Sequence, residues 1–177
     1  MASEFAVFGG GCFWCLDAQF RQVQGVRSVV CGYAGGRTPD PDYEAVCTGE
    51  TGHAEVVRVE YDAERISCRQ LLELFLACHD PTTPNRQGHD VGTQYRSIIV
   101  CQNAAQRLEA EAVLKACAAS GAWSAPIVTE VVDAMPFHAA EDCHQDYFTK
   151  HPRQGYCIAV VGPKVARFRD LLRHRSG

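Results

Sequence analysis

The sequence predicts an α+β fold with a ferredoxin-like (βαββαβ) core and a C-terminal extension. Its apolar residues switch between the two-residue period of strands and the 3.6-residue period of helices. The resulting order is strand, helix, strand, strand, helix, strand, which is the split βαβ arrangement. The 177 residues contain no internal repeat, low-complexity tract or linker-like stretch. We therefore expect a single domain over residues 1–177.

A run of glycines joins the first strand to the first helix. Residues 5–8 (FAVF) form a short apolar strand, and the glycines at 9–11 end it. Residues 12–22 then follow the helical period. A second strand is expected over 26–33. The Gly, Pro and Asp residues of 34–41 are typical of turns and predict a loop.

The second half of the core begins with a strand over residues 54–61, whose side chains alternate with period two. Ser67 and Gln70 form a plausible capping box for a helix that ends at about residue 78. The remaining elements are expected in this order: a Pro/Gly-rich loop over 80–94, a strand over 95–101, a helix from about 103, a strand near 127–132, a polar helix near 138–148 and an amphipathic tail helix over 164–173.

Composition and charge exclude several classes of function. The hydrophobic fraction is 46%, the charged fraction is 21% and the net charge is −4, so neither nucleic acid nor an anionic membrane is an expected partner. Residues 1–5 lack the basic and apolar regions of a signal peptide, and no run approaches the ~18 apolar residues of a membrane span. We expect a cytoplasmic protein whose ten cysteines are mostly reduced, several of them simply core residues.

The sharpest chemical feature is the sequence GGGCFWC, in which Cys12 stands where a helix begins. Unpaired amide groups and the helix dipole favour an anion there, so a thiol pKa of about 8.5 can fall to between 3.5 and 7.5. The thiolate is the nucleophilic form, and this position predicts a reactive Cys12.

Three other interpretations of this sequence compete with a reactive cysteine. A phosphate-binding loop lacks the Lys-[Ser/Thr] that should follow the glycines. A zinc site lacks a second CxxC to complete its ligands. Cys12 could also be a core residue, although apolar packing does not call for three glycines before a helix. We therefore expect neither a metal nor any other cofactor.

The neighbouring residues suggest the kind of substrate. Phe13 and Trp14 could form an apolar wall beside the thiolate, suited to a thioether methyl group, or they could be core residues. Glu55 lies in phase with the apolar residues of its strand. If it is buried, its pKa is raised and it remains an acid near pH 7. If the strand begins after Glu55, the carboxyl is solvated at a loop edge.

Five motifs resemble those of type A peptide methionine sulfoxide reductases: GGCFW at 10–14, GYAGG at 32–36, TGHAE at 51–55, RQG at 86–88 and GTQYRS at 92–97. They occur in the order of that family and cover roughly residues 5–157. The resemblance implies a two-layer α+β sandwich around the ferredoxin-like core, with a mixed sheet. It also implies reduction of the S epimer of methionine sulfoxide, peptide-bound and free, as repair of oxidative damage.

The resemblance also implies roles for individual residues. Cys12 would attack the sulfoxide sulfur, and Phe13 and Trp14 would hold the S-methyl group. Glu55 would supply a proton to the sulfoxide oxygen, which is a poor leaving group unless protonated. The residues implied to hydrogen-bond that oxygen or to line the same pocket are Tyr43, Tyr95 and Asp90.

The resemblance leaves the recycling route open. The product at Cys12 would be a sulfenic acid, which a second cysteine converts to a disulfide that thioredoxin reopens. Cys157 matches a segment where the family carries a recycling cysteine, and it is expected in a mobile tail loop. Cys15, at a position often occupied by Gly, is the other candidate. Asp17 and Val91 also depart from the commonest pattern, which has Glu and His there, and the tail lacks a glycine-rich segment with a further cysteine.

Two other functions remain as alternatives. The CxxC at Cys12 and Cys15 could belong to a thioredoxin-like disulfide oxidoreductase, although such an enzyme needs no acid at Glu55. A metal-binding module could use the mixed polar segment that contains His138, Glu141, Cys143 and His144, although it matches no zinc-protease pattern. For the reductase we expect a monomer.

Overall fold

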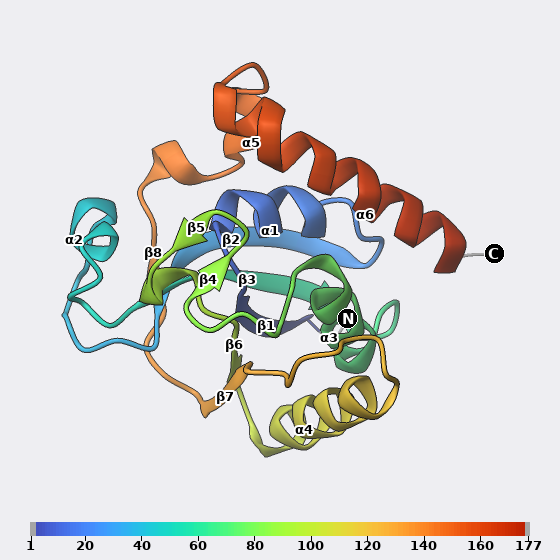
Figure 1. The fold of residues 1–177 in the computed structure, drawn as a ribbon. Helices are drawn as coiled ribbons and strands as arrows, with labels where there is room; N and C mark the ends of the chain where they lie inside the picture. Colours follow the sequence, from blue (N-terminus) through green and yellow to red (C-terminus); the bar gives the residue numbers. More distant parts are fainter. Residues whose placement is uncertain (1–2, 176–177) are drawn as a thin grey trace.

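The computed structural model describes residues 3–175, which form a mixed sheet with helices packed against it (Figure 1). The six strands of the sheet lie in the order β7-β6-β1-β3-β2-β8. All neighbouring strands are antiparallel except β6 and β7, which makes the sheet mixed. The strands are β1 (Ser3–Gly9), β2 (Val26–Ala34), β3 (Ala54–Asp62), β6 (Ile98–Cys101), β7 (Glu130–Asp133) and β8 (His138–Ala139).

The helices follow the sequence signals closely where a cap is present. Ser67 and Gln70 form the expected capping box at the start of α3. Asn103 caps α4 by accepting a hydrogen bond from the amide of Gln106. The helices are α1 (Phe13–Phe20), α2 (Tyr43–Cys47), α3 (Cys68–Cys78), α4 (Ala104–Ala119), α5 (Tyr147–Lys150) and α6 (Gly162–Arg175), and a π-helical turn, η3 (Cys157–Val161), leads into α6.

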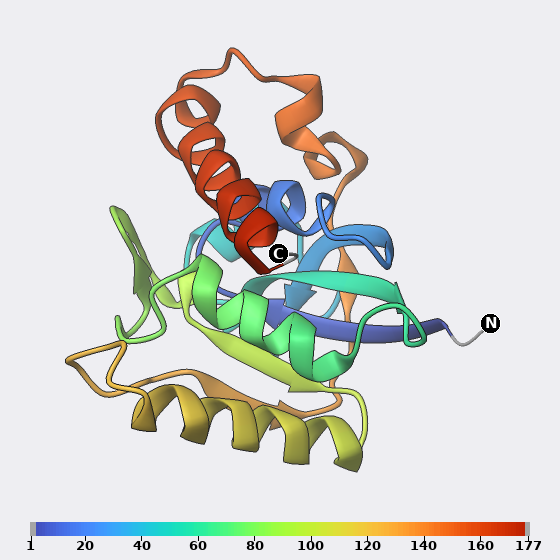
Figure 2. The ribbon, with the colours of Figure 1, turned by 90° about the vertical axis from the view of Figure 1, so that its right-hand side faces the viewer.

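The main core lies on the face of the sheet that carries Phe8, Val57 and Val59, together with apolar residues of α1, α3, α4 and α6. A smaller cluster on the opposite face contains Val7 and Val56. In Figure 2, α6 runs alongside α1, and their contact includes Phe20 and Phe168, whose ring centroids are 5.7 Å apart. The C-terminal helix α6 thus packs against the last residue of α1 and holds α1 in place. No helix within residues 3–175 has the length and apolarity needed to cross a bilayer.

The prediction of a polar helix over 138–148 was wrong. This segment contains β8, a 3-10 turn η2 (Asp142–His144) and α5. Ala139 pairs with Gly32 of β2, and the Gln145 side chain bonds to both the amide and the carbonyl of Cys31. Asp146 then adopts a left-handed backbone (φ 52°), which interrupts a helix. Tertiary hydrogen bonds to β2 therefore replace the helical ones.

Three smaller predictions also differ from the structure, and one helix was missed. The strand expected at 95 begins at Ile98, because Thr93–Tyr95 form a 3-10 turn, η1. The loop over 80–94 contains a two-stranded hairpin, β4 (Arg86–Gln87) and β5 (Asp90–Val91). The helix α2 was not predicted; Asp42 caps it through the amide of Ala45. Finally, Glu130–Asp133 form the strand expected at 127–132.

Candidate active site

Cys12 lies at the junction of β1 and α1. It is the N-cap residue of α1, with extended backbone angles (φ −63°, ψ 129°). Its carbonyl accepts the amide of Cys15 at 3.1 Å, which forms the first turn of the helix. Only 8% of Cys12 is exposed. The thiol is therefore held at a helix start, as the sequence indicated, but in a largely dry environment.

The glycines before Cys12 are required by close packing. A Cβ atom on Gly10 would come within 2.6 Å of the His79 ring, and Gly11 has φ +92°, a left-handed value that favours glycine. The Gly11 amide donates to the carbonyl of Tyr95 at 3.1 Å. His79 is itself fixed by a 2.8 Å hydrogen bond to Ser97. The glycine loop before Cys12 is therefore held in place by packing against His79 and by the hydrogen bond to Tyr95.

Glu55 is buried beside Cys12. It is 1% exposed and lies within β3, opposite Tyr33 of β2. Its Oε1 accepts the amide of Phe13 at 3.1 Å. Burial raises the pKa of Glu55 to about 8, and the hydrogen bond from Phe13 opposes this only in part. Of the two alternatives left by the sequence, the buried carboxyl is the one observed.

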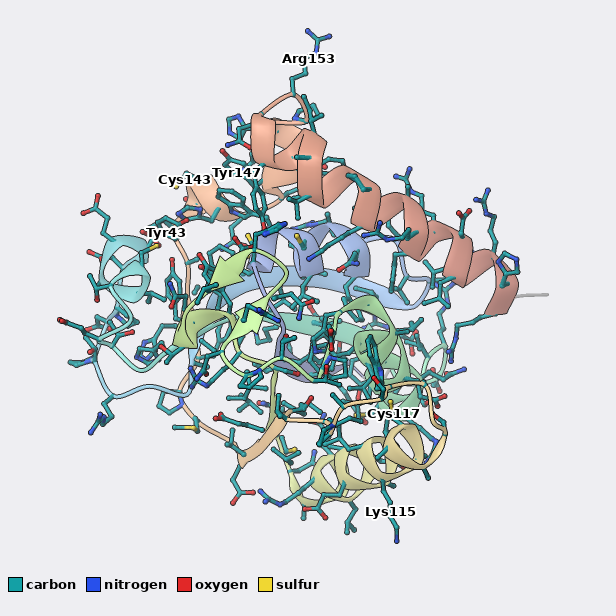
Figure 3. The ribbon with its side chains drawn as sticks, viewed as in Figure 1. Tyr43, Lys115, Cys117, Cys143, Tyr147 and Arg153 are labelled. Atoms are coloured by element: carbon teal, nitrogen blue, oxygen red, sulfur yellow. The ribbon has the colours of Figure 1, made fainter. Side chains whose placement is uncertain are left out.

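Aromatic rings surround the residues that follow Cys12. Trp14 stacks on Tyr147 with ring centroids 3.8 Å apart, and its Nε1 donates to Nδ1 of His144 at 3.3 Å. Phe13 is fully buried and lies 6.3 Å from the ring of Tyr43. Figure 3 shows Tyr43 and Tyr147 at the same end of the molecule, on α2 and α5. Segments far apart in the sequence thus build one apolar wall.

The other expected pocket residues lie around this wall. Tyr43 is half-buried, and its amide donates to Glu141 at 3.1 Å. Tyr95, at the end of η1, is half-buried near Glu55, and its burial raises the pKa of the phenol. Asp90 accepts a 2.6 Å hydrogen bond from the hydroxyl of Tyr156. The structure therefore brings all three into the neighbourhood of Glu55.

The two candidate recycling cysteines are both buried. Cys15 is 2% exposed and Cys157 is fully buried, and the Cys15 sulfur lies 4.0 Å from the hydroxyl of Tyr156. The expectation that Cys157 lies in a mobile tail loop was wrong, because Cys157 begins the π-helical turn and its amide is held by the side chain of Gln154. The apolar residues that follow it pack into the core and order this segment.

The expected lowering of the Cys12 pKa was also wrong. Burial raises the pKa of Cys12 well above that of a free thiol, and its hydrogen bond to Cys15 acts in the same direction. The same hydrogen bond lowers the pKa of Cys15, assisted by the charge of Lys164. A helix N-terminus favours a thiolate, but here desolvation outweighs it. Burial therefore favours the neutral thiol form of Cys12 in the free protein.

Sequence reasoning missed several residues that support this site. Tyr156 joins Cys15 to Asp90, and its only signal was its position next to Cys157. Glu141 accepts both the hydroxyl of Tyr33 at 3.0 Å and the amide of Tyr43; it had been considered as a metal ligand. Within the described part of the chain, no three His, Cys, Asp or Glu side chains are grouped to hold a metal ion.

A thiol beside a neutral carboxylic acid and an apolar wall can exchange oxygen or electrons with a bound substrate, which is the chemistry of cysteine-dependent oxidoreductases. The model of one such family, peptide methionine sulfoxide reductase, matches residues 4–176. A peptide methionine sulfoxide reductase MsrA of Ralstonia nicotianae is 58% identical, over 98% of this chain and 93% of that protein. The MsrA of Trichodesmium erythraeum is 52% identical, over 92% of each chain.

Solved structures agree with the family match. Methionine sulfoxide reductase A of Corynebacterium diphtheriae is similar with a TM-score of 0.83 and 36% identity, over 89% of this chain and 78% of that one. Reduced Mxr1 of Saccharomyces cerevisiae has a TM-score of 0.81 and 33% identity, over 88% and 89%. The chain therefore belongs to the peptide methionine sulfoxide reductase family, and it is an oxidoreductase.

Proposed function

We propose that this protein reduces the S epimer of methionine sulfoxide, peptide-bound and free, to methionine, as repair of oxidised proteins. The observation that carries the proposal is the buried Glu55 carboxyl, which accepts the amide of Phe13, the residue next to Cys12, and whose pKa burial raises to about 8. A sulfoxide oxygen needs a proton before it can leave. A disulfide oxidoreductase has no use for such an acid, which makes that alternative the weaker one.

The proposed reduction proceeds by attack of Cys12 sulfur on the sulfoxide sulfur. The S-methyl group lies against Phe13 and Trp14, and the stacking of Trp14 on Tyr147 orients this wall. Glu55 gives its proton to the sulfoxide oxygen, and the hydroxyls of Tyr43 and Tyr95 stabilise charge on that oxygen. Oxygen moves to Cys12 as a sulfenic acid, and the substrate leaves as a thioether. Asp90 lines the same pocket and holds Tyr156.

Recycling is proposed to run as a relay through Cys15 and Cys157. Cys15 lies one helical turn from Cys12, whose carbonyl accepts the Cys15 amide at 3.1 Å, so it can condense with the sulfenic acid and release water. Exchange with Cys157 then moves the disulfide toward the C-terminal segment, with Cys157 as the essential partner. Mxr1 has been solved in complex with Trx2, and a thioredoxin is the reductant we propose here.

The finer features of the fold belong to the same proposal. We regard β6-β1-β3-β2 with α1 and α3 as a ferredoxin-like core, since these strands have the 4-1-3-2 order that a βαββαβ unit forms. The apolar faces of the helices join one core cluster, which supports a two-layer sandwich. We further propose a single domain over residues 1–177, a monomer and a cytoplasmic location.

The test is activity on the two separated epimers of a methionine sulfoxide peptide, with dithiothreitol as reductant. We expect turnover of the S epimer and little turnover of the R epimer, since one enzyme usually serves one epimer. Equal rates on both epimers, or no methionine from either, would contradict the proposed function.

A further inference from the structure

Two side chains of one C-terminal segment fix the indole of Trp14. The ring of Tyr147 stacks on it with ring centroids 3.8 Å apart and an angle of 4° between the ring planes. Nδ1 of His144 accepts the indole N–H at 3.3 Å. The wall proposed for the S-methyl group therefore depends on what holds the segment that contains His144 and Tyr147 against α1.

Asp17 is the α1 residue that binds this segment. It lies one helical turn after Trp14 and is 1% exposed. Its Oδ2 accepts the backbone amide of Asp146, the residue before Tyr147, at 2.8 Å. The Asp17–Asp146 hydrogen bond and the Trp14–Tyr147 stack thus join the same two segments, one turn of α1 apart. A shift of one contact would also move the other.

The amide that Asp17 accepts belongs to a residue with an unusual backbone. Asp146 has φ 52°, a left-handed value, and it precedes the first residue of α5. Few residues other than Gly, Asn and Asp adopt this conformation readily. Asp17 therefore fixes the chain at the point where it turns into α5 and so directs the side chain of Tyr147.

Arg21 holds the Asp17 carboxylate from the other side. Its Nε donates to Oδ1 of Asp17 at 2.6 Å, and its Nη2 donates to the carbonyl of Val29 in β2 at 2.9 Å. An exposed ion pair four residues apart on a helix would contribute little. Here the carboxylate is buried, both of its oxygens accept hydrogen bonds, and the network connects α1 to β2 and to the start of α5.

We propose that Asp17 is a positioning residue that sets the size of the S-methyl pocket, because through the Asp146 amide it holds Tyr147 against Trp14. This role rests on the proposed function. Asp17 acts through the stacked rings and not on the substrate itself. While the indole is fixed, the wall fits a methyl group, and a larger alkyl group must displace it. Without Asp17 the indole can move, and the pocket admits the larger group.

The test compares two peptide substrates, the S epimers of methionine sulfoxide and of its S-ethyl analogue, ethionine sulfoxide, with dithiothreitol as reductant. One methylene in an apolar pocket changes kcat/KM by roughly 10–200-fold, so wild type should prefer the methyl compound to this extent. In Asp17→Ala the ratio of the two kcat/KM values should fall by about tenfold or more. A variant that was merely less stable would lose activity on both substrates equally and keep the ratio.

Two further variants separate the hydrogen bond from general effects on folding. Asp146→Gly is the matched control, since it keeps the backbone amide and glycine tolerates the left-handed conformation; its ratio should equal that of wild type. Asp17→Asn keeps the shape of the side chain if Asp17→Ala folds poorly. Its one carboxamide oxygen cannot serve both donors as well as a carboxylate does, so its ratio should fall between those of wild type and Asp17→Ala.

A pair of substitutions tests whether Asp17 acts through the stacked ring. Tyr147→Leu should lower the ratio as Asp17→Ala does, and the double variant should show no further loss, because both changes remove the same contact. Independent, additive losses would contradict the proposal. So would a wild-type ratio in both Asp17→Ala and Asp17→Asn.

Failure of the proposed function would look different, because wild type would then form no thioether from either substrate. Positioning of the indole can be measured even in that case. In a Trp123→Phe background, which leaves Trp14 as the remaining tryptophan, acrylamide should quench the fluorescence of Asp17→Ala more strongly than that of Asp146→Gly. Equal quenching in these two variants would overturn the positioning role.

Discussion

Replacing Glu55 by Gln separates the chemistry of the carboxyl from its packing. At a pKa of about 8, roughly nine-tenths of Glu55 is protonated at pH 7, against less than about 1% for an ordinary glutamate. The amide keeps the shape and can still accept the Phe13 amide, but it has no proton to give. We expect the single-turnover rate of sulfoxide reduction to fall by about 10²–10⁴ in Glu55→Gln. Wild-type activity should fall as pH rises through about 8.

The same substitution should change stability in a defined direction. Because the folded-state pKa of Glu55 lies above 4.5, the folded protein binds a proton that the unfolded chain has lost. The free energy of unfolding of wild type therefore falls as pH rises from about 5 toward 8. A glutamine has no such proton to bind, so Glu55→Gln should gain about 2.5 kcal/mol relative to wild type between pH 5 and pH 7.

Urea unfolding of both proteins at the two pH values measures this gain, and rapid quench of one turnover measures the rate. A rate that is unchanged in Glu55→Gln would remove the carboxyl from the reaction. A stability difference that does not vary with pH would mean that Glu55 is ionised in the folded protein, which contradicts the burial argument.

Three further outcomes follow from the site. Cys12→Ser should abolish sulfoxide reduction even with dithiothreitol, and wild-type turnover by that variant would refute the assignment of the nucleophile. Cys157→Ser should lose thioredoxin-dependent turnover but keep one full turnover, whereas full recycling would transfer the essential role to Cys15; peptide mapping after one equivalent of substrate identifies the disulfide. Gly10→Ala should destabilise the protein by about 1–3 kcal/mol in thermal unfolding, because the new Cβ would come within 2.6 Å of His79; an unchanged melting temperature would contradict the close packing.

The regular part of the fold could be predicted because its signals are local. The alternation around Glu55 gave the strand β3, and the Ser67–Gln70 pair marked the start of α3, as the structure confirms. The same reasoning failed around Asp146, where it predicted a helix. The conformation of this segment depends on the hydrogen bond between Gln145 and Cys31, which are more than 100 residues apart in the sequence. Such long-range hydrogen bonds leave no periodic pattern.

The sequence predicted which residues form the candidate site better than it predicted the pKa values of those residues. The glycine turn correctly indicated a cysteine at a helix start, and the phase of Glu55 left burial as one of two alternatives. The pKa of Cys12 could not be inferred, since it depends on how completely the tertiary fold removes water from the thiol. The placement of Cys157 also required the fold, because the packing of α6 against α1 orders that segment.

The most direct test of the account follows the oxygen atom. The Cys15→Ser/Cys157→Ser variant, which lacks both proposed partners of the sulfenic acid, is reacted with one equivalent of an ¹⁸O-labelled S-epimer sulfoxide peptide. Mass spectrometry then locates the label. We predict ¹⁸O on the peptide that contains Cys12, in an amount equal to the methionine formed. Label on another cysteine, or methionine formed with Cys12 unmodified, would contradict the claim that Cys12 takes the oxygen from the substrate.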